Sequence, residues 1–209
     1  MREPSSAWWI TALHTNSSKM ARHAGRPDES TKEWTVEYSF TLKYQLSEQD
    51  CDHADIVERL GAAGCEDALV GVGQPGRIAL EFTREAAGAQ AALVSALGDV
   101  KRALPSAKLI EAAPDFVGLT DVADVIGVTR QNMRKLMVSH ATSFPAPVHE
   151  GSSALWHLAE VLSWLQAKGS YKLEQAVLDV AVTAMQINLA RQARQITAQV
   201  QREVRALVA

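Results

Sequence analysis

The 209-residue chain has few of the residues that build covalent or membrane-bound frameworks. Only two cysteines occur, Cys51 and Cys65, and their spacing fits no zinc-ligand pattern. Two cysteines also make no disulfide scaffold, so a reducing cytoplasm is the expected compartment. No apolar run approaches the ~20 residues of a membrane-spanning helix, and we expect no membrane contact. A disulfide-rich secreted fold and an integral membrane protein are both disfavoured.

A large excess of one charge is also missing, because 21 Lys and Arg stand against 24 Asp and Glu, for a net charge of -3. This balance excludes a general polyanion binder of the histone type. Any contact with nucleic acid must therefore use one local basic face. The 47% hydrophobic content is sufficient for one or two cores.

Catalytic and metal-binding patterns are absent as well. No nucleophile-elbow or phosphate-loop sequence organises the Ser, His and Asp residues. His149 and His157 have no further ligand at a metal-type spacing, so we expect loop or surface imidazoles. The sequence therefore predicts no enzyme, no metal and no cofactor.

The first 31 residues are rich in Ser, Thr, His, Arg and Asp without periodicity, which is typical of a mobile N-terminal arm. Met20 is an alternative start. A less favoured alternative is that Arg22, Arg26 and the two Trp of this arm contact DNA or a partner.

Residues 32–113 alternate between strand and helix patterns. Strict period-two alternation from Trp34 to Leu46 predicts a half-buried strand. Asp52 caps a predicted helix with the face Ile56, Val57 and Leu60. Strands over 67–72 and 77–83, a helix ended by Pro105 and a strand over 108–112 follow. The order βαββαβ predicts a ferredoxin-like sandwich.

Two other functions of this first domain are disfavoured. The stretch Gly71–Gly76 has the spelling GxGxxG, but a strand follows where a dinucleotide site needs a helix, so we interpret it as a hairpin turn. A sheet that binds single-stranded RNA stacks bases on exposed aromatics, and residues 77–82 offer only Phe82. Self-association, or an effector pocket that the sequence does not locate, stays open for this domain.

Residues 119–165 contain the most informative pattern. Thr120 is expected to cap a first helix and to lie among the DNA-contacting residues. Gly127 allows a sharp exit from that helix, and Thr129 can cap a second helix that runs to about Ser139. The second helix has the apolar stripe Met133, Leu136 and Met137.

The remaining residues near the start of this second helix carry polar side chains: Arg130, Gln131, Asn132, Arg134 and Lys135. Amide side chains pair bidentately with adenine edges, and cations suit guanine edges or phosphates. No acid lies between Thr129 and His149, which is unusual for a solvated surface helix. The pattern predicts a helix that enters the major groove, and the alternative is an ordinary helical domain with a polar face.

Here the chain resembles a known family. Ala123, Gly127, Met133 and Leu136 match the spacing of the bacterial helix-turn-helix, and the continuation Phe144–Val148, Gly151-Ser152 and Leu155–Leu165 looks like the winged helix of the excisionase, AlpA and MerR type. The resemblance covers about a quarter of the chain. It implies base or phosphate contacts from Thr129, Arg130, Gln131, Asn132, Arg134 and Lys135, and wing contacts from His149, Ser152 and Ser153. The wing carries Glu150 and no Arg or Lys, which departs from that expectation.

The last segment, residues 173–207, lacks Gly and Pro and predicts one long helix. Its apolar residues follow spacings of 4, 3 and 4, an eleven-residue period that keeps one straight stripe. The stripe consists of Leu178, Val182, Met185, Leu189, Ala193, Ile196, Val200, Val204 and Leu207. We expect it to pair with a second copy, and the alternative is that the helix folds back across its own domains.

The combined prediction is a homodimeric, sequence-specific transcriptional regulator that binds double-stranded DNA. It divides into an arm (1–31), a ferredoxin-like domain (32–113), a winged helix-turn-helix (114–170) and a dimerisation helix (171–209). The alternatives are an excisionase-like architectural protein, an antitoxin-like autoregulator, and a protein-interaction or effector-sensing module that does not bind DNA.

Overall fold

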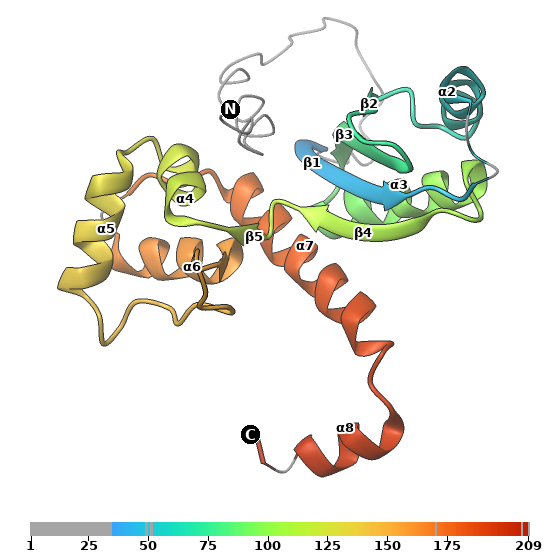
Figure 1. Cartoon of the computed structure of the whole chain (residues 1–209). Coiled ribbons are helices and arrows are strands. Elements are labelled where there is room, and N and C mark those ends of the chain that lie inside the picture. The colour runs from blue at the N-terminus through green and yellow to red at the C-terminus, as the bar shows by residue number, and fades with distance from the viewer. Residues whose placement is uncertain (1–34, 49, 51, 170, 206, 209) are drawn as a thin grey trace, which may run out of the picture.

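The computed structural model describes residues 35–208 except 49, 51, 170 and 206. The predicted arm over 1–31, and Trp34 of the first predicted strand, lie outside these residues. The chain is α+β, and it consists of a sheet unit (residues 36–113), a helical unit (residues 116–168) and two C-terminal helices (Figure 1).

The sheet unit has the element order that the sequence predicts. Its four strands form one antiparallel sheet in the order β2-β3-β1-β4. The strands are β1 (Val36–Gln45), β2 (Ala68–Gly71), β3 (Arg77–Ala86) and β4 (Lys108–Ala113), and the helices are α2 (His53–Ala62) and α3 (Ala89–Ala103). Asp52 caps α2 as expected, because its carboxylate accepts from the Ala54 N–H at 2.8 Å.

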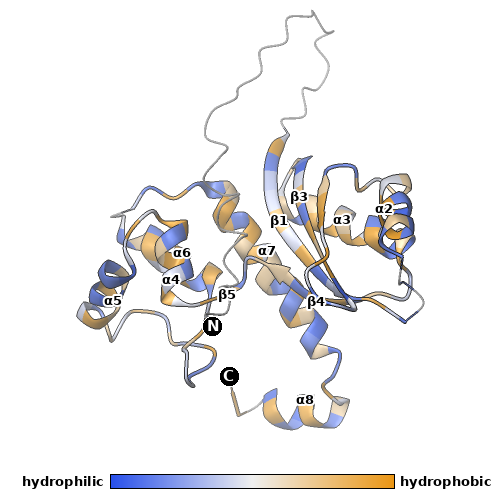
Figure 2. Ribbon diagram, turned by 45° about the horizontal axis from the view of Figure 1, so that its top comes forward, coloured by the Kyte–Doolittle hydropathy of each residue, from blue (hydrophilic) through white to orange (hydrophobic). Residues whose placement is uncertain are grey.

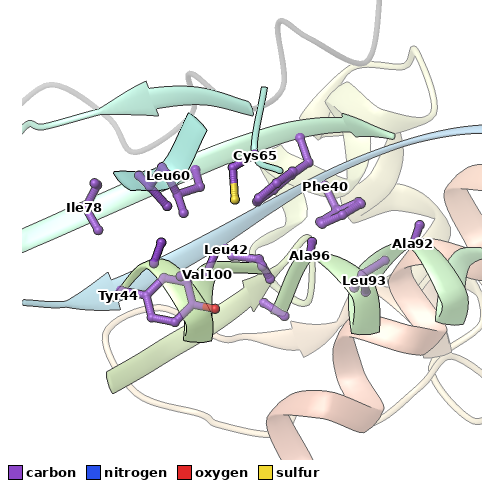
Figure 3. Packing of buried hydrophobic residues seen from close by; sticks show 14 of the residues in the cluster. Phe40, Leu42, Tyr44, Leu60, Cys65, Ile78, Ala92, Leu93, Ala96 and Val100 are labelled. Carbon is purple, nitrogen blue, oxygen red and sulfur yellow. The ribbon is translucent and has the colours of Figure 1, made fainter. Parts of the chain in front are cut away.

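One face of this sheet and the helices enclose the first core (Figure 3). Period-two alternation along β1 places Tyr38, Phe40, Leu42 and Tyr44 on the buried face. Phe40 stacks on Phe82 of β3 with ring centroids 5.2 Å apart. The prediction that Val57 lies on the buried face of α2 is wrong, because its side chain is 49% exposed and the buried residues of this helix are Ile56 and Leu60.

Two features of the sheet unit concern RNA binding and dinucleotide binding, the two functions that the sequence disfavours for this unit. Phe82 is fully buried, so it offers no stacking surface for RNA bases. The stretch Gly71–Gly76 is a hairpin connection, with a hydrogen bond from the Arg77 N–H to the Gln74 carbonyl at 3.1 Å. Gly76 has a φ of 71°, a backbone conformation that residues with a side chain rarely adopt.

The helical unit is built around a second core. Its elements are β5 (Phe116–Val117), α4 (Leu119–Val125), α5 (Arg130–Ser139), β6 (Trp156–His157) and α6 (Leu158–Lys168). The short strands β5 and β6 pair in antiparallel fashion and join the two ends of the unit. Val122 of α4, Met133 of α5 and Leu162 of α6 are fully buried between them.

The predicted single C-terminal helix is wrong. Two helices occur, α7 (Gln175–Ala193) and α8 (Ala198–Arg205), separated at residues 194–197. The Thr197 hydroxyl accepts from the Val200 N–H at 3.4 Å and starts a new helix. No Gly or Pro marks this break, which is why the sequence pattern concealed it.

Helix α7 lies between the two units and contributes to both cores (Figures 1 and 2). Val180 and Ala184 pack in the first core, whereas Leu178 and Ala181 pack in the second. A helix that is apolar on opposite faces is a buried helix. Leu178, Val182 and Met185 therefore pack within their own chain, which corrects their assignment to a dimer interface.

Among the described residues, no helix has the length and apolar content needed to cross a lipid bilayer.

Candidate nucleic-acid interface

Helix α4, the first helix of the candidate site, is not capped by Thr120 as the sequence predicted. Gly118 is the residue that precedes α4, and the Asp121 carboxylate accepts from the Gly118 N–H at 2.8 Å. Thr120 is the second residue of the helix and is exposed, so it does not cap. An acid in the first turn satisfies a backbone N–H and complements the positive end of the helix dipole.

A tight turn connects α4 to α5. Gly127 has a φ of 71°, a conformation that favours glycine and reverses the chain direction. The Val128 N–H donates to the Ala123 carbonyl at 2.8 Å, which closes the end of α4. The Thr129 hydroxyl then accepts from the Asn132 N–H at 3.2 Å and caps α5, as predicted.

Helix α5 has one buried side and one polar side. Met133 is fully buried, and Leu136 and Met137 are half-buried against the same core. The remaining predicted contact residues are exposed, namely Thr129, Arg130, Gln131, Asn132, Arg134 and Lys135. Figure 2 shows most of α5 as hydrophilic, on the side of the molecule farthest from the sheet. The surface thus holds three cations and two amides without an intervening acid.

The loop over residues 144–155 follows α5 and is anchored at its base. Phe144 packs edge-on against Trp156 and Trp164, with centroid distances of 6.2 and 5.1 Å. The Trp156 indole N–H donates to the Pro145 carbonyl at 3.1 Å. His149 forms a bridge with Leu155, which narrows the loop into a short hairpin.

The outer end of this hairpin carries the three residues assigned to a wing. His149, Ser152 and Ser153 are all exposed, together with Glu150. Hydroxyl groups and an imidazole can donate to phosphate oxygens, whereas Glu150 opposes an approaching polyanion. The hairpin is therefore suited only to a weak contact with the phosphate backbone of a nucleic acid.

His157 was misassigned as a loop or surface residue. It is 7% exposed, and its Nδ1 lies 2.6 Å from Oδ1 of Asp115, which is 1% exposed. Asp115 in turn contacts Asn188 of α7. Asp115 and Asn188 were not among the predicted site residues, although an acid between Pro114 and Phe116 in an apolar stretch is a signal of a buried polar group.

The sheet unit contains one described cysteine, Cys65, which is buried. Burial raises the pKa of the Cys65 thiol to about 11, with a further contribution from Asp99, so this thiol is a poor nucleophile at neutral pH. Within the described part of the chain, no three His, Cys, Asp or Glu side chains are grouped as metal ligands.

Comparison with known proteins adds no assignment, because no family model, no curated protein and no solved structure matches the chain.

Proposed function

We propose that the chain is a sequence-specific transcriptional regulator that binds double-stranded DNA through α5. In this proposal the helical unit is a winged helix-turn-helix of the excisionase, AlpA and MerR type. The order β5, α4, turn, α5, hairpin, β6 and α6 supports it. The sheet unit, with its βαββαβ order, is proposed to be a ferredoxin-like sandwich.

The observation that carries the proposal is the outward surface of α5. Its buried side fixes the helix on the second core through Met133, while Arg130, Gln131 and Asn132 of the first turn are exposed. A helix that enters the major groove needs this division, because its core-facing side positions it and its free side contacts base edges. The amides are suited to adenine, and the arginines to guanine or phosphate.

Local charge supports the same assignment. Arg130, Arg134 and Lys135 give α5 three positive charges in a chain whose net charge is -3. The chain as a whole is therefore not attracted to DNA, and binding depends on this surface. Neutralising three phosphates per copy predicts a slope, for the logarithm of the affinity against the logarithm of the salt concentration, of about -3 for one copy and about -5 for a bound dimer.

We propose that a second copy binds through α8 rather than through the whole predicted stripe. We name four exposed apolar residues the stripe, namely Val200 and Val204 of α8, Ile196 before this helix and Leu207 after it, and their exposed fractions are 40 to 82%. Helix α8 lies apart from the rest of the chain in both views (Figures 1 and 2). At 100° per residue, Arg202 and Arg205 fall on the opposite side of α8. Antiparallel pairing of two copies buries the stripe without bringing arginines together.

Pairing of two chains is functionally relevant because one helix contacts only a few base pairs. A symmetric dimer contacts two half-sites about one helical turn apart, so the preferred DNA sequence is expected to be palindromic. Regulation by such a protein is occlusion or recruitment at a promoter.

The experiment is selection of bound fragments from a random DNA pool by the full chain, followed by sequencing. A palindromic consensus whose binding weakens with salt supports the proposal. Recovery of unenriched sequences at every salt concentration argues instead for a protein-interaction module.

A further inference from the structure

Three buried polar side chains join the sheet unit, α7 and the helical unit. We name Asp115, His157 and Asn188 the latch. Asn188 is 0% exposed, Asp115 1% and His157 7%. We propose that the latch fixes the orientation of α5 relative to the sheet unit and thereby acts as a positioning device for DNA binding, an inference that rests on the proposed function.

Asn188 connects α7 to the outer edge of β4. Its Oδ1 accepts from the Ala112 N–H at 2.9 Å, and its Nδ2 donates to the Ala112 carbonyl at 2.8 Å. One side-chain amide thus satisfies both backbone groups of Ala112 on the side of β4 where no strand of the described residues pairs. An unpaired edge is otherwise open to another strand, so Asn188 also terminates the sheet.

The Asn188 amide also binds Asp115, which lies between β4 of the sheet unit and β5 of the helical unit. Nδ2 of Asn188 donates to Oδ2 of Asp115 at 2.7 Å, and His157 lies 2.6 Å from Oδ1 of Asp115. The Asp115 carbonyl accepts from the Leu158 N–H at 2.7 Å, at the start of α6. A continuous path of hydrogen bonds therefore runs from β4 through α7 to β6 and α6.

Apolar packing holds α7 against both cores, through Val180 and Ala184 on one side and Leu178 and Ala181 on the other. Apolar contacts are non-directional, so the hydrogen bonds of the latch add a restraint on the position of α7 that packing does not supply. Hydrogen bonds have narrow geometry, and an unpaired buried polar group is costly, so a displaced α7 would leave Asp115 and Asn188 unsatisfied. The latch therefore selects one arrangement of the two units.

The direct test measures the distance between the units by electron spin resonance. Spin labels are attached at Gln90→Cys of α3 and Val138→Cys of α5, both exposed positions, in a Cys51→Ser background. Labelled chain is diluted with an excess of unlabelled chain, so that only distances within one chain are measured. Affinity for a selected DNA fragment is measured in parallel.

Asn188→Leu removes the polar atoms of the latch and keeps the branching of the side chain, and Gln186→Leu makes a comparable change from amide to leucine at an exposed position of α7. We expect a broadened distance distribution and a DNA affinity about two- to thirtyfold lower for Asn188→Leu. The Gln186→Leu chain should match the parent. An unchanged narrow distribution in folded Asn188→Leu, or equal broadening in Gln186→Leu, would overturn the latch.

A charge exchange keeps the test decisive if Asn188→Leu does not fold. Asn188→Asp alone places two carboxylates face to face, and adding Asp115→Asn restores a donor and an acceptor between the two positions, although the hydrogen bond to the Ala112 carbonyl stays lost in both variants. The double variant should recover a narrower distribution than Asn188→Asp, and failure to do so would contradict the latch. Absence of DNA binding by the parent chain would instead overturn the proposed function, since the distances are measured without DNA.

Discussion

The hydroxyl of Thr129 and the backbone N–H of Asn132 form a 3.2 Å hydrogen bond that starts α5 at Arg130. Because of this cap, Arg130, Gln131 and Asn132 occupy the first helical turn, where backbone N–H groups and the helix dipole add positive potential. The cap therefore determines both where the helix begins and which side chains stand at its positive end.

Loss of this cap should weaken the protein moderately. Thr129→Ala leaves the Asn132 N–H without its partner, and we expect a decrease of about 1 kcal/mol in the free energy of unfolding. Urea denaturation measures this change. Thr129→Ser keeps a hydroxyl and serves as the control, so equal losses in the two variants would mean that the cap is not responsible.

The largest single loss of stability should come from Arg84. Its guanidinium donates to Asp67 at 2.6 and 2.9 Å, to Asp99 at 2.7 Å, to Ser95 and to the Gly64 carbonyl, which uses all five donors. Arg84→Met leaves the partly buried Asp67 without its ion-pair partner and leaves Asp99 with Arg102 alone, and we expect a loss of about 3 kcal/mol.

Arg84→Lys should rescue little of this loss, because an ammonium group cannot reproduce the planar pair of bonds to Asp67. The free energy of unfolding from urea titration distinguishes these outcomes. Stability of Arg84→Lys within experimental error of the parent chain would show that charge alone is sufficient at this position.

Acidification should reduce stability through Asp50. Its carboxylate accepts from Arg59 at 2.6 Å and from Ser47 and Ser106, and the Arg59 hydrogen bond lowers its pKa. A lowered pKa in the folded chain adds stability above the unfolded value of about 3.9, and this contribution is lost as the pH falls through the folded pKa. The melting temperature of Asp50→Asn should therefore approach that of the parent below about pH 4. A constant difference between the two chains from pH 7 to strongly acidic conditions would exclude this role.

Self-association should depend on α8 and not on α7. A chain that ends at Arg194 keeps both cores and loses the stripe of Ile196, Val200 and Val204. We expect analytical ultracentrifugation to find this chain folded and largely monomeric. Val200→Glu is a point variant with the same expected effect, and Gln201→Glu adds the same charge beside the stripe as its control. A dimer of undiminished strength would move the interface elsewhere.

The sequence predicted the elements of the sheet unit because local signals determine them. Alternation along β1, the Asp52 cap and Pro105 after α3 each act within a few residues, and the structure agrees at all three positions. The same holds for Thr129 and Gly127 in the turn before α5. The exposure of the polar residues of α5 also followed from the periodicity of its apolar stripe.

Nonlocal contacts explain the errors. The eleven-residue period correctly indicated helical structure but not the break at residues 194–197. A single sequence also gives no information about whether a partner or the chain itself covers the apolar residues. In the structure α7 is buried by both units, so Leu178 is unavailable to a second copy. Likewise, Asn188 reaches Asp115 across 73 residues of sequence, a separation at which no pattern rule applies.

The most direct test of DNA recognition by α5 is the affinity of single-residue variants for a DNA fragment selected from a random pool, measured by fluorescence anisotropy at fixed salt. Arg130→Ala and Asn132→Ala should each weaken binding by about 1 to 3 kcal/mol, or about 5- to 150-fold, while circular dichroism stays unchanged. Val138→Ala, an exposed apolar residue on the same helix, should bind like the parent chain. Unchanged affinity in both Arg130→Ala and Asn132→Ala would contradict the assignment of α5 as the DNA-reading helix.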